Sequence, residues 1–139
     1  MNIIYIDGIP EEYDNRDYSD RNIHREDGPA IEVDGNKHWF LNGKHHRVDG
    51  PAIEWATGTK EWYLSGKHHR VDGPAIEHIN GRKDWFLNGK RHRIDGPAIE
   101  DTDVALAWWI DGYWYSFEDF IKEAKLPDEQ AILLALEWL

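Results

Sequence analysis

Apolar and polar side chains alternate over short segments of this chain, and the alternation returns at a fixed interval. In residues 60–64, Lys-Glu-Trp-Tyr-Leu, an extended strand would place Trp62 and Leu64 on one face and Tyr63 on the other. Residues 51–55 precede it and begin with proline, which a strand tolerates at its first position. Residues 56–59 carry turn-forming side chains, so we expect a β-hairpin here.

The hairpin recurs along the chain. The sequence His-Arg-x-Asp-Gly-Pro-Ala-Ile-Glu occurs four times, and the steps between its aspartates are 22, 23 and 23 residues. The four copies begin at His24, His46, His69 and His92. Such a short, regular repeat predicts one structural unit stacked on copies of itself. We therefore expect a mainly β fold, a single-layer antiparallel meander of stacked hairpin repeats of about 23 residues with a C-terminal helical cap.

The expected organisation is a single repeat domain over residues 1–139. Residues 1–23 would form an N-terminal strand (2–8) and an acidic loop (9–23), residues 24–115 the hairpin repeats, and residues 116–139 the helical cap. The acidic loop has no periodicity, and Asp14, Asp17 and Asp20 lack the spacing of a calcium loop, so we expect it to be solvated. In the fourth unit, residues 101–107 replace the usual hairpin turn.

Two rows of aromatic residues follow from the alternation. Tryptophans would stack as a ladder along one face, and since burying an indole contributes roughly 3 kcal/mol, this ladder is the expected core. It comprises Trp39, Trp62, Trp85 and Trp108, with Ile31, Ile53, Ile76 and Ile99 as expected partners. The opposite row would pack against the terminal helices or a second subunit, or stay exposed as a stacking platform for bases or sugars. This second row is Phe40, Tyr63, Phe86 and Trp109.

The C-terminal segment has the signals of two helices. Ser116 is a typical N-cap with Asp119 three residues later, and apolar spacing predicts a helix over 117–125. Pro127 would start a second helix, and residues 131–139 are nearly all apolar. We expect this helix to cover the last hairpin, with a contact to a second subunit or a partner as the alternative.

The repeat resembles the MORN-like class of short hairpin repeats, in the variant Trp-x-Leu-Asn-Gly-Lys-x-His-Arg-x-Asp-Gly-Pro-Ala. Segments 39–52, 62–75 and 85–98 carry the pattern, with Ser65 replacing Asn once, and the similarity covers about residues 24–125. The resemblance implies a scaffold fold and a viral origin in a tailed phage or a large DNA virus, and it implies no activity.

Charge and composition narrow the function. The net charge is −11, and the repeat block 24–100 is neutral while residues 1–23 carry −4 and residues 101–139 carry −7. Acidic ends of this kind argue against direct binding to nucleic acid. The chain has no cysteine, no secretory signal pattern and no apolar run near the ~20 residues that cross a bilayer. A cytoplasmic location, in the host cytoplasm if the protein is viral, and no membrane partner are the expectations.

The repeated His-Arg pairs are the main candidate for ligand chemistry. A row of imidazole and guanidinium groups could bind the phosphates of a nucleotide, although a motif inside the turns of every unit is more typical of architecture. These residues are His46, Arg47, His69, Arg70, His92 and Arg93. Adjacent histidines such as His45 and His46 point to opposite faces of a strand, which excludes a shared zinc site. No catalytic motif is present, Glu54 and Glu77 are read as solvated strand positions, and we expect neither an enzyme nor a cofactor.

The predicted function is therefore non-enzymatic binding. We expect a phage-encoded inhibitor that binds a host protein through the repeat sheet or the acidic ends, in counter-defence or host takeover. One alternative is a homo-oligomer that sequesters a phosphorylated nucleotide messenger on the His-Arg row. Another is an acidic mimic of DNA, and the last is a structural component of a virion.

Overall fold

Each repeat folds into two short hairpins placed end to end, because the predicted strand is interrupted at its tryptophan. The structure is a computed structural model that describes residues 2–101 and 106–139. Of the segment 60–64, β8 (Lys60–Glu61) and β9 (Tyr63–Leu64) are strands, and Trp62 lies between them. The backbone N–H of Trp62 donates instead to the carbonyl of Ala75 in the following unit, at 2.7 Å. The hydrogen bond made at the interruption thus joins neighbouring units.

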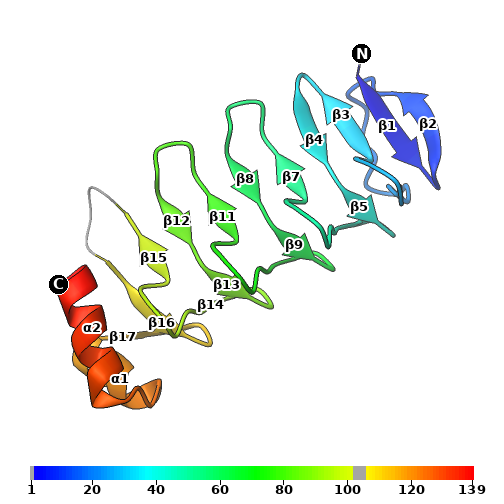
Figure 1. Ribbon diagram of the computed structural model, residues 1–139. Helices are drawn as coiled ribbons and strands as arrows, with labels where there is room; N and C mark the ends of the chain where they lie inside the picture. The colour runs from blue at the N-terminus through cyan, green and yellow to red at the C-terminus, as the bar shows by residue number, and fades with distance from the viewer. Residues whose placement is uncertain (1, 102–105) are drawn as a thin grey trace.

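The first hairpins of all units form one antiparallel sheet along the molecule (Figure 1). Pairing alternates between strands of one unit, where Ile53 lies opposite Glu61, and strands of neighbouring units, where Ile76 lies opposite Glu61. This confirms the predicted meander. Within the described residues its nine strands are, in spatial order, β2 (Ile9–Glu12), β1 (Ile3–Ile6), β3 (Ile31–Val33), β4 (Asn36–His38), β7 (Ile53–Glu54), β8, β11 (Ile76–Glu77), β12 (Lys83–Asp84) and β15 (Ile99–Glu100).

The second hairpins form a row of separate two-stranded sheets. In the turn between β5 and β6, Asn42 and Gly43 have φ angles of 49° and 75°, as a type I′ turn requires. Asparagine and glycine tolerate this left-handed region better than other residues, which explains their recurrence in the sequence. The four hairpins are β5 (Phe40–Leu41) with β6 (Lys44–His45), β9 with β10 (Lys67–His68), β13 (Phe86–Leu87) with β14 (Lys90–Arg91), and β16 (Trp108–Ile110) with β17 (Tyr113–Tyr115).

At the N-terminus the chain forms an abbreviated unit, in which β1 lies within the strand predicted over residues 2–8. Tyr5 takes the place of the tryptophan, and its N–H donates to the carbonyl of Ala30 at 2.7 Å. The expectation of a solvated loop over 9–23 was partly wrong. Residues Ile9–Glu12 form β2, and Tyr18 is buried against Ile4 and Ile6. This cluster closes the N-terminal end of the sheet because an open end would expose apolar surface.

At the C-terminus two helices cover the last hairpin. Helix α1 (Phe117–Glu123) begins after Ser116, whose hydroxyl accepts a hydrogen bond from the backbone N–H of Asp119 at 3.2 Å, so the predicted N-cap is confirmed. Helix α2 (Asp128–Trp138) follows directly after Pro127. Phe120 and Leu134 are buried with Trp108. The other side of α2 is exposed, and the altered turn of the fourth unit falls partly on residues 102–105, outside the described residues.

Candidate functional site

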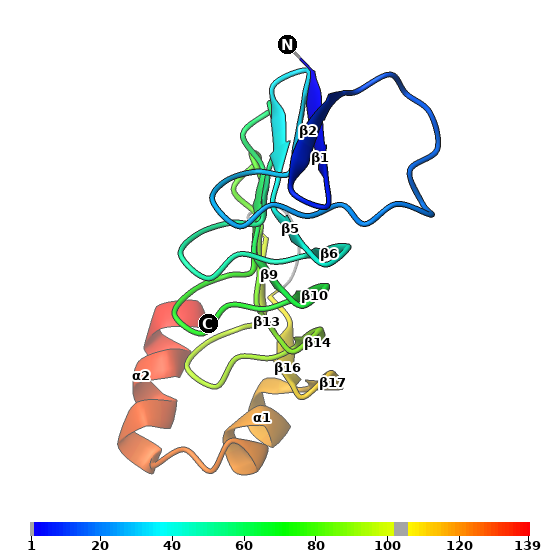
Figure 2. The same ribbon diagram turned by 90° about the vertical axis from the view of Figure 1, so that its right-hand side faces the viewer.

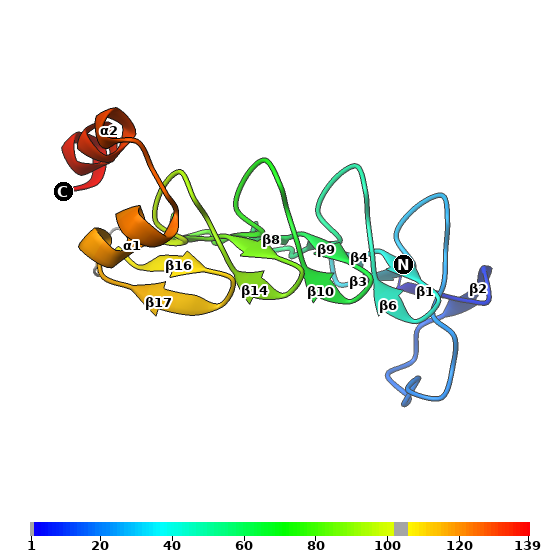
Figure 3. The ribbon, with the colours of Figure 1, turned by 90° about the horizontal axis from the view of Figure 1, so that it is seen from below.

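The sheet presents two faces of different chemistry. Loops 24–29, 46–51, 69–74 and 92–97 stand along one side, which we name the loop face, while the small hairpins extend to the other side in Figure 2. Figure 3 shows the loops projecting side by side in a row, with α2 beyond the last of them. The opposite face carries the second aromatic row and its histidines, and we name it the ring face.

On the loop face each repeat arginine covers the tryptophan of its own unit. The guanidinium carbon of Arg70 lies 3.9 Å from the ring centre of Trp62, a cation–π contact. Its Nε donates to Asp72 at 3.4 Å, and its Nη1 donates to the carbonyl of Pro74 at 3.1 Å and to Glu77 at 2.9 Å. Arg47 over Trp39 and Arg93 over Trp85 repeat the arrangement, both at 3.9 Å. These arginines therefore hold the loops in place.

The glutamates of the repeat are partners of these arginines, which corrects their reading as solvated positions. Glu54 accepts from Arg47 at 3.2 Å, as Glu77 does from Arg70. Register also places each glutamate opposite a lysine, as with Glu54 and Lys60. Cross-strand pairs of opposite charge contribute to sheet stability, so the sequence pattern Ile-Glu has a structural cause.

The repeat histidines fix the turn of the following unit. The Nδ1 atom of His46 accepts the backbone N–H of Ser65 at 3.0 Å, and His69 and His92 accept those of Asn88 and Asp111 at 3.0 and 3.1 Å. An acceptor at Nδ1 requires the neutral ring with its proton on Nε2. The six residues of the predicted His-Arg row thus lie on the loop face and make contacts that hold the loops and turns. The Nε and Nη1 atoms of the arginines and the Nδ1 atoms of the histidines already take part in hydrogen bonds.

Grooves separate successive loops. The central groove, of about 790 Å³, has Trp62 and Leu64 at its floor, residues 47–51 as one wall and residues 69–72 as the other. Two equivalent grooves lie on either side of it, over Trp39 and over Trp85. Val71 at the loop tip is 81% exposed, and Asp72 beside it is also exposed.

The continuous aromatic stack lies on the ring face, and the expected tryptophan ladder was wrong. Among the described residues no ring contact joins Trp39, Trp62 and Trp85, because each indole packs beneath an arginine. On the ring face, ring centres follow one another from unit to unit. The distances are 4.0 Å for Phe40–His45, 5.1 Å for His45–Tyr63, 4.1 Å for Tyr63–His68 and 5.2 Å for His68–Phe86.

Arg91 extends the stack, since its guanidinium lies 5.2 Å from the ring of Phe86 and 5.5 Å from that of Trp109. The four predicted aromatic residues are therefore brought together, with imidazoles between the first three and the guanidinium of Arg91 before the last. The terminal helices pack on Trp108 instead. Ile31, Ile53, Ile76 and Ile99 lie opposite ring-face residues such as His38 and Glu61, so they do not pair with the tryptophans.

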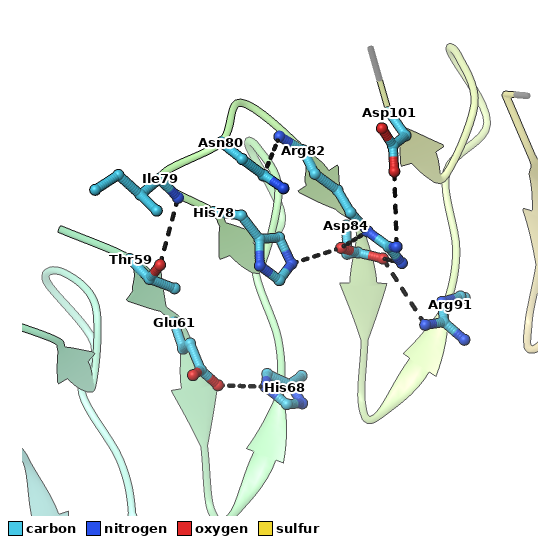
Figure 4. Close-up of polar contacts among 10 residues, drawn as sticks. All are labelled: Thr59, Glu61, His68, His78, Ile79, Asn80, Arg82, Asp84, Arg91 and Asp101. Atoms are coloured by element: carbon cyan, nitrogen blue, oxygen red, sulfur yellow. Dashed lines mark hydrogen bonds and ion pairs between the residues drawn. The ribbon is translucent and has the colours of Figure 1, made fainter. Parts of the chain in front are cut away.

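Two facing positions on the ring face hold a different pair of residues in each successive unit. The pairs are His38 with His45 at 3.2 Å, then Glu61 with His68 at 2.9 Å, then Asp84 with Arg91 at 3.8 Å (Figure 4 shows the last two). Burial, reinforced by His38, lowers the pKa of His45 to about 4. The hydrogen bond from His68 is the main cause that lowers the pKa of Glu61 to about 2.

Asp84 is a buried carboxylate at the centre of a polar cluster (Figure 4). Arg82 donates to both of its oxygens at 2.9 Å, and His78 lies 2.9 Å away. Burial is the largest single influence and raises the pKa of Asp84, but the hydrogen bonds and charges of Arg82 and His78 together outweigh it and hold the pKa below its usual value. A carboxylate held ionised by a guanidinium is a structural ion pair and a poor general base.

Trp114 is a ring-face residue that the sequence reasoning missed. It lies directly opposite Trp109 in the last hairpin, and 62% of it is exposed. Its position matches His45, His68 and Arg91 of the earlier units. Aligning Asp111-Gly112 with the Asn-Gly turns would have placed it there from the sequence.

Differences between the units gather on the ring face. On the loop face the three full repeats agree in Trp, Leu, His, Arg, Asp and Glu, and the tip residue alone changes, being Val48, Val71 or Ile94, with Glu26 in the first loop. On the ring face three positions vary among aromatic, imidazole and charged side chains. The first position is occupied by Trp55 and His78 in successive units, and the second by His38, Glu61 and Asp84. The third is occupied by His45, His68, Arg91 and Trp114.

Over the described ranges, no group of three His, Cys, Asp or Glu side chains has the geometry of a metal site. In the same part of the chain, no helix combines the length and the apolar character needed to cross a membrane. Comparisons with protein-family models, with curated proteins and with solved structures gave no match for this chain.

Proposed function

We propose that this protein is a non-enzymatic scaffold that binds one specific partner protein through its ring face. The observation that carries the proposal is the variation between units. Residues that hold a repeat together must recur in every unit, whereas residues that contact a nonrepetitive partner need not. The ring face concentrates the varying residues, and they include the Trp, Tyr and Arg side chains that dominate binding energy in protein interfaces.

The proposal extends to an inhibitor that masks a host protein, encoded by a phage. The resemblance of the repeats to MORN-like viral repeats supports this part. A flat, preformed sheet loses little conformational entropy on binding, which suits a protein that acts by covering a surface.

The nucleotide-sequestering alternative is less well supported by the geometry. It required the guanidinium groups of Arg47, Arg70 and Arg93 to bind phosphate in a bidentate manner. Their Nε and Nη1 atoms already donate to aspartate, proline carbonyl and glutamate oxygens, as at Arg70. Phosphate would have to displace these bonds.

A pair of neighbouring substitutions tests the proposal. Trp114 and Tyr113 are adjacent in β17 and 62% and 69% exposed, but they point to opposite faces because strand side chains alternate. We expect a protein retained from bacterial lysate by the wild type and by Tyr113→Asp to be lost with Trp114→Asp. The readout is quantitative mass spectrometry of the retained proteins. Retention of the same proteins by all three forms, or of none by the wild type, contradicts the proposal.

A further inference from the structure

We infer that the loop face is a second, independent binding surface for an extended polypeptide in the polyproline II conformation. This segment carries an aromatic side chain at every third residue and basic side chains between them. The inference goes beyond the ring-face function and rests on the grooves between the loops.

The three grooves share one plan, although their volumes differ, at about 790, 560 and 380 Å³. Each has a tryptophan and a leucine at its floor, as Trp62 and Leu64 in the central one, and a loop with Arg, Asp and Gly in its wall. Similar sites in a row suit a ligand whose own side chains recur with the same spacing, because each site then gains one equivalent contact.

The place that a fourth groove would take, after the last loop, shows which kind of side chain fits such a groove. Beyond the last loop, Trp138 of α2 lies 5.6 Å from the guanidinium carbon of Arg93, on which Trp85 already stacks at 3.9 Å. Leu133 and Leu134 of the same helix line the space next to Ile94. The chain's own apolar segment therefore occupies this position. In the three open grooves a partner's aromatic ring would meet the corresponding arginine in the same way.

The spacing of the units selects the backbone conformation. Each unit adds two hydrogen-bonded strands to the sheet, which gives a pitch of about 9.6 Å. One turn of polyproline II, three residues of 3.1 Å, advances about 9.3 Å and returns a side chain to the same side. An extended strand repeats its faces every ~6.7 Å and falls out of step. A helix is about 10 Å wide and too thick to enter a gap between loops at this pitch.

The groove rims favour a basic ligand. Asp49, Asp72 and Asp95 stand at the loop tips with side chains 82–88% exposed, and one oxygen of each receives the arginine Nε. With the side chains this exposed, the other oxygen of each carboxylate is accessible to a cation at the loop tip. Lysines between the aromatic residues would meet these carboxylates and approach the protein under electrostatic attraction.

The test uses a fluorescent peptide of repeated Pro-Lys-Tyr triplets, long enough to cross all three grooves, and measures its anisotropy with the full chain. Its control is an isomer with the same residues but all tyrosines in one block. We expect the triplet peptide to bind at least ~10-fold more tightly than the isomer, since only it fills several grooves at once. Equal affinities of the two peptides would show that charge attraction alone accounts for binding, and would overturn the inference.

Variants locate the site. Val71→Arg and, in a second protein, Val48→Arg place a cation at an exposed tip beside a groove, and we expect each to weaken the triplet peptide about tenfold. Ile79→Arg makes the same change at a 71% exposed turn away from the loops and should leave binding unchanged. Equal weakening by all three overturns the inference. The Trp114→Asp variant should bind the triplet peptide as the wild type does. Loss of peptide binding and loss of the ring-face partner can therefore be told apart.

Discussion

The two faces of the sheet use aromatic residues in opposite ways. On the loop face each indole is covered by an arginine of its own unit, and the rings of successive units do not meet. On the ring face Tyr63 contacts His45 of the preceding unit and His68 of its own. Side chains join neighbouring units on both faces, since Arg70 also donates to Glu77 of the following unit at 2.9 Å, but only on the ring face do the rings follow one another from unit to unit. On the loop face the indoles stay apart, and grooves lie between the loops.

Substitution of Tyr63 breaks the continuous face and has the largest expected effect. Tyr63→Ala removes two ring contacts and the hydrogen bond from its hydroxyl to Glu61 at 3.1 Å, so the free energy of unfolding should fall by about 3 kcal/mol. Urea unfolding followed by circular dichroism measures it. Tyr113→Ala, on an exposed residue of the last hairpin, is the control and should change stability by less than about 0.5 kcal/mol. A similar loss in both variants would mean that the ring stack adds nothing.

Substitution of Arg70 tests the other face, with a smaller expected effect because one of its ion-pair partners, Asp72, is largely exposed to solvent. Arg70→Met removes the cation–π contact and the bonds to Asp72, Pro74 and Glu77, which should cost about 2 kcal/mol in urea unfolding. Arg70→Lys keeps the charge but lacks the planar fork, and we expect it to recover less than half of the loss. Full recovery by lysine would show that charge alone matters and that the loop is not held by guanidinium geometry.

Mild acid should weaken the ring face in particular. The pKa of His45 is about 4 in the folded protein and near 6.5 in the unfolded chain, so the unfolded state binds more protons between these values. Stability should then fall as pH drops from 6.5 towards 4. Because the ring is only half-buried, the loss between pH 7.5 and pH 5 is expected to be on the order of 1 kcal/mol. Glu61 adds a loss at lower pH, between 4.5 and about 2.

His45→Phe is the matched variant for the acid effect. It keeps a ring between Phe40 and Tyr63 but cannot titrate, although His38 loses its partner. We expect the difference in unfolding free energy between pH 7.5 and pH 5 to shrink in this variant. An unchanged pH dependence would assign the effect to other groups, such as His38, whose pKa burial also lowers.

Local signals gave much of the fold and little of the site. The period, the Asn-Gly turns and the cap at Ser116 each depend on a few neighbouring residues, and all three are found in the structure. The break in the strand at Trp62 carries no local signal, because it arises from a hydrogen bond to Ala75 in the next unit. The burial of Tyr18 likewise depends on Ile4 and Ile6, far along the chain. The turn residues within the His-Arg row already favoured architecture over a ligand site, but the partners of Arg70 and His69 are identified only by the structure.

By itself the sequence determined that this chain is a row of antiparallel hairpins closed by helices, because repetition and turn chemistry are properties of short segments. Only the tertiary structure decided what each face does. Trp62 and Tyr63 are adjacent and chemically alike, yet one lies beneath Arg70 and the other lies between two imidazoles. The partners come from register and from neighbouring units, and such contacts between distant residues are fixed when the units stack.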